Sequence, residues 1–196
     1  MLNTTIRAFV AIELPPTVSQ ELLNVQKRLG QGSSAAARWV APSGIHLTLK
    51  FLGDVAESRT AQIAIALDEV CRSAQPLEME LQGAGCFPGP ERPRVVWVGV
   101  GGDVAGLKRI QIKVDEALAR LGFSVEARGF TPHLTVARLR DGADAVEVKN
   151  LVEKLRGVVV ARVPFRVAEV AMIRSELRPG GALYTRLSAA KLGGGG

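Results

Sequence analysis

Short strand patterns and longer helix patterns alternate along the chain from its first residues. Residues 5–14 are rich in β-branched and aromatic side chains and stop at two prolines, which is typical of a strand. Residues 18–29 carry apolar side chains at helical spacing, and Thr17 or Ser19 could cap the helix. The first two elements are therefore expected to be a strand followed by an amphipathic helix.

The rest of the chain repeats this rhythm in two halves. The pattern predicts strands over 38–40, 45–52, 77–82, 95–100, 133–139 and 182–188, one or two strands over 158–173, helices over 57–73, 105–121 and 146–155, and a Gly/Pro-rich loop over 83–93.

The two histidines of the chain both occur in the tripeptide His-Leu-Thr. His46 precedes Thr48, and His133 precedes Thr135, about half a chain length away. Each copy lies in a predicted strand and is followed by a helix. We therefore expect a pseudo-duplicated structure, whose two halves bring the motifs face to face.

Alternation along a strand decides which side chains each motif presents together. His46, Thr48 and Lys50 should share one face, while Phe51 should belong to the core. We expect Lys50 at the solvated surface or in support of the site rather than in catalysis.

The second motif should present His133 and Thr135 on one face. Strict alternation puts Arg138 on the opposite face, so it could reach the site only if the strand bends, bulges or ends there. The first motif has Phe51 at the equivalent position, so the two motifs are not symmetric.

Composition narrows the class of protein and of partner. With 47% hydrophobic and 22% charged residues and no long apolar run, the chain is typical of a globular protein without a transmembrane helix. It shows no secretory signal, so a cytoplasmic location is expected. The net charge of +6 favours anionic partners, above all nucleic acid. Cys71 and Cys86 fit no zinc pattern and are expected to be buried thiols.

Two imidazoles and two hydroxyls around one ligand suit phosphodiester chemistry. A neutral imidazole can take a proton from water, and a protonated one can give a proton to the leaving oxygen. Thr48 and Thr135 could hydrogen-bond phosphate oxygens, and Arg138 could hold a phosphate bidentately. This scheme requires no metal and no cofactor.

At these residues the sequence resembles the 2H phosphoesterase superfamily. More closely it is similar to the RNA 2′,3′-cyclic phosphodiesterases, also called 2′-5′ RNA ligases, over nearly the whole chain. The segments that carry the resemblance are RAFVAI (7–12), RWV (38–40), HLTLKFLG (46–53), FP (87–88), PRVVWVGV (93–100) and FTPHLTVAR (130–138).

The resemblance implies a bilobal α+β fold with two antiparallel sheets lining a central cleft and helices outside. It implies one catalytic domain over 1–192 with one motif per lobe, and a disordered glycine tail over 193–196. It further implies metal-independent hydrolysis of RNA 2′,3′-cyclic phosphate ends to 2′-phosphomonoesters, with reverse 2′-5′ ligation by the same residues. The expected partners are RNA ends or nucleoside 2′,3′-cyclic phosphates, and the expected state is a monomer.

The resemblance also assigns roles to individual residues. His46 and His133 are implied as acid and base, and Thr48, Thr135 and Arg138 as phosphate ligands. Which histidine is the acid stays open, with His133 favoured as the base.

Base stacking needs aromatic side chains, and the chain offers three candidates. Tyr184 is preferred for this role, whereas Phe9 and Trp39 are expected chiefly in core packing.

Three alternatives remain from the sequence. The first is an RNA-end-binding or RNA-processing protein with little turnover. The second is a phosphodiesterase for linear oligonucleotides, and the third is a phosphoesterase for small metabolites.

Overall fold

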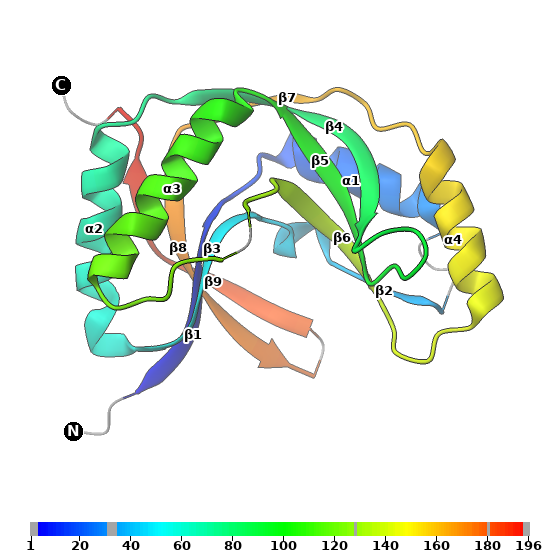
Figure 1. Ribbon diagram of the computed structural model, residues 1–196, viewed down its shortest axis with the longest axis horizontal. Helices are drawn as coiled ribbons and strands as arrows, with labels where there is room; N and C mark the ends of the chain where they lie inside the picture. The colour runs from blue at the N-terminus through cyan, green and yellow to red at the C-terminus, as the bar shows by residue number, and fades with distance from the viewer. Residues whose placement is uncertain (1–3, 31–34, 128, 180, 194–196) are drawn as a thin grey trace.

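The computed structural model describes residues 4–30, 35–127, 129–179 and 181–193. Within them the chain forms nine strands and four α-helices (Figure 1). The strands are β1 (Thr5–Ile12), β2 (Ala37–Trp39), β3 (Leu47–Ala56), β4 (Leu77–Phe87), β5 (Val95–Gly102), β6 (His133–Leu139), β7 (Pro164–Val167), β8 (Glu169–Arg178) and β9 (Gly181–Lys191). The helices are α1 (Pro16–Leu29), α2 (Thr60–Arg72), α3 (Val104–Arg120) and α4 (Ala145–Gly157), with short 3₁₀ turns at Pro42–Gly44 and Glu57–Arg59.

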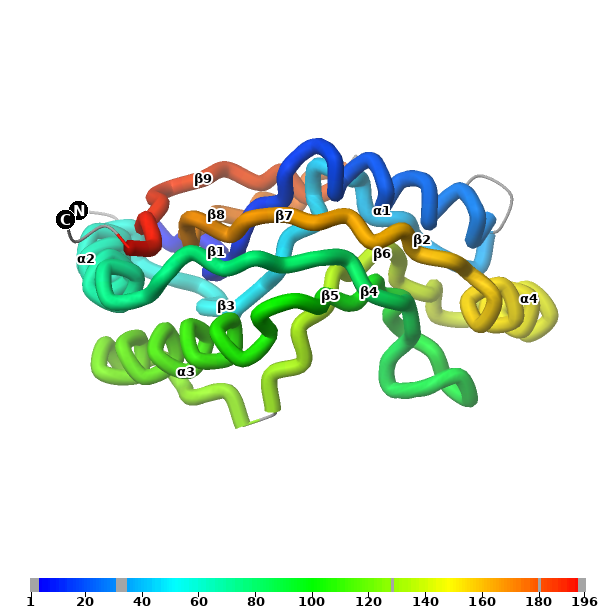
Figure 2. Tube along the Cα trace, turned by 90° about the horizontal axis from the view of Figure 1, so that it is seen from above, coloured from blue at the N-terminus to red at the C-terminus, as the bar shows by residue number. Residues whose placement is uncertain are grey.

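The strands form two antiparallel sheets, which confirms the expected α+β fold. Sheet A has the strand order β3-β1-β8-β9, and sheet B has the order β2-β6-β5-β4-β7. Helices α2 and α3 pack on sheet A, and α1 and α4 pack on sheet B. Figure 2 shows these two helix pairs toward opposite ends of the molecule. We call the faces of the sheets that these helices leave uncovered the open faces.

The main hydrophobic core fills the space between the helices and the covered faces of both sheets. Val10, Leu22, Leu67, Leu134 and Met172 are among its fully buried members. Burying one such aliphatic side chain stabilises the fold by about 1.5–3 kcal/mol.

A second, smaller cluster lies on the open face of sheet A. It joins Phe9, Ala11, Ala171 and Ile173, with Tyr184 packed against them. An apolar patch therefore lies beside the first motif, apart from the main core.

One error in the predicted elements concerns β4. The strand was expected to end at residue 82, but it continues to Phe87 past a register shift between Leu81 and Ala84. Gly83 has a φ of +64° at this shift. Glycine adopts that conformation without strain, so the residue that suggested a loop instead permits a bulge within a continuous strand.

Both ends of the chain differ from expectation in detail. Helix α1 begins at Pro16, upstream of Thr17 and Ser19, and has no side-chain cap, because a proline in the first turn starts the helix there.

The C-terminal glycine tail was expected to begin at residue 193. The Gly193 amide donates to the carbonyl oxygen of Cys71 at 3.2 Å. Residues 194–196 of the predicted tail lie outside the described residues.

Candidate active site

The two motif strands are β3 in sheet A and β6 in sheet B, which contact each other where the sheets meet. His46 directly precedes β3, and His133 is the first residue of β6. One His-Leu-Thr copy thus lies in or next to each sheet.

Strand β3 carries a bulge directly after its motif threonine. Val10 of β1 pairs with Lys50 and Ala11 pairs with Thr48, so Leu49 is the extra residue. The bulge turns Lys50 to the covered face, where it is only 6% exposed. The prediction that Lys50 shares a face with the histidine and threonine is therefore wrong, since strict alternation does not continue through a bulge.

The same bulge brings Phe51 out of the core. Phe51 pairs with Phe9 across β1 and β3, with ring centroids 6.1 Å apart, and it is 68% exposed. The expectation of a core position for Phe51 is also wrong.

Strand β6 has a bulge at the matching position. Val96 of β5 pairs with Ala137 and Trp97 pairs with Thr135, so Val136 is the extra residue. Arg138 consequently lies on the same face as Thr135, opposite to the face that strict alternation gives it. From the sequence, Arg138 could reach the site only if β6 bent, bulged or ended near it, and β6 has such a bulge.

Gln26 of α1 supports the bulge in β6 from the covered side. Its side chain is fully buried, and its Nε2 donates to the carbonyl oxygens of Val136 at 2.8 Å and Val40 at 2.6 Å. Val40 begins the segment that leads through the 3₁₀ turn to His46. One helix side chain thus holds the segments that carry both histidines.

The His46 ring lies in an aromatic environment on sheet A. It meets Phe9 and Tyr184 edge-on, with centroids 5.6 and 5.0 Å away, and it bonds to the carbonyl of Gly44. Burial lowers the pKa of His46 more than the charge of Glu13 and the Gly44 bond raise it. His46 is therefore mainly neutral at pH 7 in the free protein.

The His133 ring has a similar arrangement on sheet B. Phe87 meets it edge-on at 5.0 Å, and Nδ1 lies 2.8 Å from the carbonyl oxygen of Thr131. Because a carbonyl can only accept, Nδ1 carries the proton and Nε2 stays free for proton exchange. In both motifs the ring bonds to the carbonyl two residues upstream.

The groups proposed to hold phosphate are available. Thr48 and Thr135 are half-buried, and their hydroxyls bond to none of the described residues. Arg138 is exposed and likewise forms no ion pair with them. These donors can therefore turn to an anion.

The aromatic candidates divide between the two faces. Phe9, which is 6% exposed, and Tyr184 touch His46. Trp39 packs against the main core with its Nε1 buried, so the structure does not bring it to the histidines.

Phe51, Phe87 and Glu13 surround the motifs without having been singled out as site residues. The sequence did point to Phe51, because Phe51 follows His46 at the same spacing at which Arg138 follows His133.

A cationic group on sheet A is already neutralised. Arg186 of β9 contacts Glu13 and lies 2.8 Å from Glu169. It pairs with Ile173 across the strands, which places it on the open face. The basic group nearest the first motif on β9 is therefore not free for an anion.

The buried thiols behave largely as expected. Cys71 is buried, and desolvation with the nearby Asp68 raises its pKa to about 12. Cys86 is half-buried, and burial raises its pKa as well. Both are free. Neither thiol is suited to act as a nucleophile at neutral pH.

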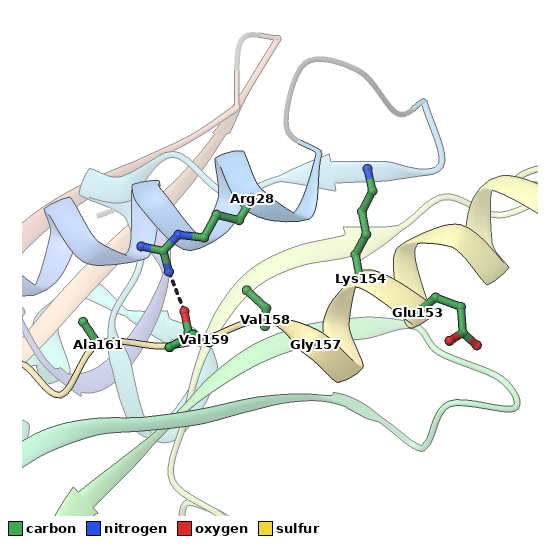
Figure 3. A pocket seen from close by; sticks show the side chains of 7 residues that line it. All are labelled: Arg28, Glu153, Lys154, Gly157, Val158, Val159 and Ala161. Atoms are coloured by element: carbon green, nitrogen blue, oxygen red, sulfur yellow. Dashed lines mark hydrogen bonds between the residues drawn. The ribbon is translucent and has the colours of Figure 1, made fainter.

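Two hollows lie outside the motifs. One of about 550 Å³ lies between α1 and the end of α4, where Arg28 bonds to the Val159 carbonyl (Figure 3). The other, of about 600 Å³, lies beside α4 and is lined by several basic residues, of which Arg94 pairs with Asp141 at 3.0 Å. Neither contains a motif residue.

Metal ligands are not clustered in the described part of the chain. It contains no group of three or more His, Cys, Asp or Glu side chains placed to bind a metal ion. No helix in these ranges is both long and apolar enough to span a membrane.

Comparison with known proteins adds to this geometry. Residues 14–179 match the model of the 2′-5′ RNA ligase superfamily. The chain is 34% identical to the RNA 2′,3′-cyclic phosphodiesterase of Methanothermobacter thermautotrophicus, covering 95% of this chain and 99% of the relative. It is 36% identical to that of Aeropyrum pernix, covering 80% and 87%.

Two solved structures share the fold over nearly the full length. TT0787 of Thermus thermophilus has a TM-score of 0.76 and 28% identity, covering 96% of this chain and 99% of the other. Escherichia coli LigT in complex with 3′-AMP has a TM-score of 0.76 and 26% identity, with the same coverage.

Proposed function

Because this chain belongs to the 2′-5′ RNA ligase superfamily, and within it to the family of the RNA 2′,3′-cyclic phosphodiesterases, we propose that it hydrolyses 2′,3′-cyclic phosphates at RNA ends. The observation that carries the proposal is the pair of bulged strands, with one histidine–threonine motif in or directly before a strand of each sheet. The net charge of +6 is consistent with an RNA substrate.

The proposed reaction uses His46 and His133 as an acid–base pair. One imidazole takes a proton from water, and the resulting hydroxide attacks phosphorus. The bond from phosphorus to O3′ breaks, and the second imidazole protonates O3′, which leaves a 2′-phosphomonoester.

We retain His133 as the favoured base, since its free Nε2 can accept a proton. The low pKa of His46 means that an acid role for it needs the negative charge of the bound phosphate to raise that pKa.

The threonines and Arg138 act on the phosphate in this scheme. The free hydroxyls of Thr48 and Thr135 donate to non-bridging oxygens, where charge develops in the transition state. Arg138 adds a charge-assisted contact from the same face of β6. The same groups serve the reverse reaction, in which a 5′-hydroxyl replaces water and a 2′-5′ linkage forms.

Phosphorus NMR of a nucleoside 2′,3′-cyclic phosphate incubated with EDTA-treated protein tests the proposal. We expect the 2′-phosphate as the sole product. Formation of the 3′-phosphate would reject O3′ as the leaving group, and activity restored only by a divalent ion would reject the metal-independent mechanism.

Incubating the protein with an RNA that ends in a 2′,3′-cyclic phosphate and an oligonucleotide with a 5′-hydroxyl tests the ligation. The ligated product should contain a 2′-5′ linkage that resists nucleases specific for 3′-5′ linkages. A 3′-5′ product would contradict the shared mechanism.

A further inference from the structure

Arg38 and Arg138 lie directly opposite each other on the neighbouring strands β2 and β6. Both side chains are exposed, and neither forms an ion pair with any described residue. Like charges in directly opposite cross-strand positions repel each other, so this pair costs stability in the free protein. An anion bound between them would remove that cost.

The pair lies on the same face as the second motif and extends outward from it. Arg138 is also paired with Val95 of β5, and Val95 with Phe87 of β4, whose ring touches His133. These four residues form one row across the open face of sheet B. Because β2 is the edge strand, the row ends at Arg38.

The basic side chains on the open face of the opposite sheet have acidic neighbours. Arg186 on the open face of sheet A is held between Glu13 and Glu169. Arg7 of β1 lies opposite Asp54 of β3, and Lys191 of β9 lies opposite Glu169 of β8. The other side chains next to the first motif are the aromatic Phe9, Phe51 and Tyr184. A polyanionic chain that leaves the histidines therefore meets free positive charge on sheet B.

We propose that Arg38 binds the phosphodiester that precedes the terminal cyclic phosphate, so that the protein prefers RNA ends of at least two nucleotides to a nucleoside cyclic phosphate. The inference rests on the proposed function, with Arg138 at the terminal phosphate and Arg38 one phosphate further along. Cross-strand neighbours have Cβ atoms about 4.5–5.5 Å apart, so two long guanidinium side chains can serve adjacent phosphates.

Three substrates separate this role from a general effect on catalysis. The first is a nucleoside 2′,3′-cyclic phosphate. The second is a dinucleotide that ends in the same cyclic phosphate, and the third is that dinucleotide with an uncharged methylphosphonate linkage. We expect Arg38→Gln to lower kcat/KM for the charged dinucleotide about tenfold, with the other two substrates changed less than twofold.

Salt dependence gives a second readout. The slope of log kcat/KM against log salt for the charged dinucleotide should become shallower by about 0.7–1 in Arg38→Gln. Arg38→Lys should retain most of that slope. Arg109→Gln, an exposed arginine on α3, is the matched control and should change neither readout.

Equal losses on all three substrates would overturn the inference, as would an equal loss on charged and uncharged dinucleotides. If the unaltered protein hydrolyses no cyclic phosphate, the proposed function fails. The Arg38 site is then tested by fluorescence anisotropy with a labelled dinucleotide 3′-phosphate. Weaker binding by Arg38→Gln than by Arg109→Gln would support the site, and equal binding would reject it.

Discussion

Gln26 donates its side-chain amide to the carbonyl oxygen of Val136 at 2.8 Å, and Val136 is the extra residue that turns Arg138 to the open face. The bond joins a buried position of α1 to a strand 110 residues further along the chain. The placement of Arg138 thus depends on packing between α1 and sheet B as well as on the motif itself.

Replacing Gln26 tests that dependence. Gln26→Leu keeps the side-chain volume but removes the donor to Val40 and Val136, so we expect a loss of about 1–3 kcal/mol in the free energy of unfolding. We also expect a fall in kcat larger than the rise in KM. Urea unfolding and steady-state kinetics well below the melting temperature measure the two effects.

Gln111→Leu is the matched control, because Gln111 is also a buried glutamine on a helix but forms no hydrogen bond with the described residues. An equal fall in kcat in both variants would contradict a specific role for Gln26.

The two histidines should act as a unit. His46→Ala and His133→Ala should each lower kcat/KM by about 10²–10⁴-fold or more, because each removes a proton donor or acceptor. The double variant should be no slower than the slower single variant. Near-normal turnover by either single variant, measured with the cyclic mononucleotide, would reject the assignment.

The charge of Glu13 should influence the pH at which His46 titrates, and therefore one limb of the pH profile of kcat/KM. One limb of the pH profile of kcat/KM should lie below pH 6.5, because burial lowers the pKa of His46. The charge of Glu13 raises that pKa, so Glu13→Gln should move this limb to still lower pH.

Glu169→Gln removes the other carboxylate beside Arg186 and should leave the limb in place. A limb that moves to higher pH in Glu13→Gln would contradict the electrostatic argument.

The buried ion pair between Lys50 and Asp115 should contribute strongly to folding. Lys50 Nζ also donates to the Ser124 carbonyl at 2.6 Å, and Asp115 accepts from the Glu126 amide at 3.2 Å. Lys50→Met leaves Asp115 buried without its partner, so we expect a loss of about 3–5 kcal/mol in the free energy of unfolding.

Adding Asp115→Asn to Lys50→Met should restore part of the lost stability in urea unfolding, since it removes the unpaired charge and keeps an acceptor for Glu126. The exposed pair of Arg94 and Asp141 provides the control, and Arg94→Met should cost no more than about 1 kcal/mol.

Phe51 should contribute to binding rather than to stability. Its ring is 68% exposed next to Phe9, so it can stack on a base or ribose. Phe51→Ala should raise KM roughly tenfold, with a smaller change in kcat and an unchanged melting temperature. Ile112→Ala, at another exposed apolar position, should leave KM unaltered. An unchanged KM in Phe51→Ala would remove Phe51 from the binding surface.

The sequence by itself determined the order of strands and helices and the shared face of His133 and Thr135, because these features follow from local periodicity, which each segment contains in full. The α+β class came from the resemblance of the motifs and their flanks to a known family. The bounds of β6 were predicted to the residue.

Only the tertiary structure decided the faces of Lys50, Phe51 and Arg138. A bulge is defined by the register between two strands, and β6 pairs with β5, which lies far upstream in the sequence. Its support comes from Gln26, in a helix of the opposite half of the chain. The sequence of β6 alone contains neither partner, so only the folded chain shows which way the strand turns after its motif.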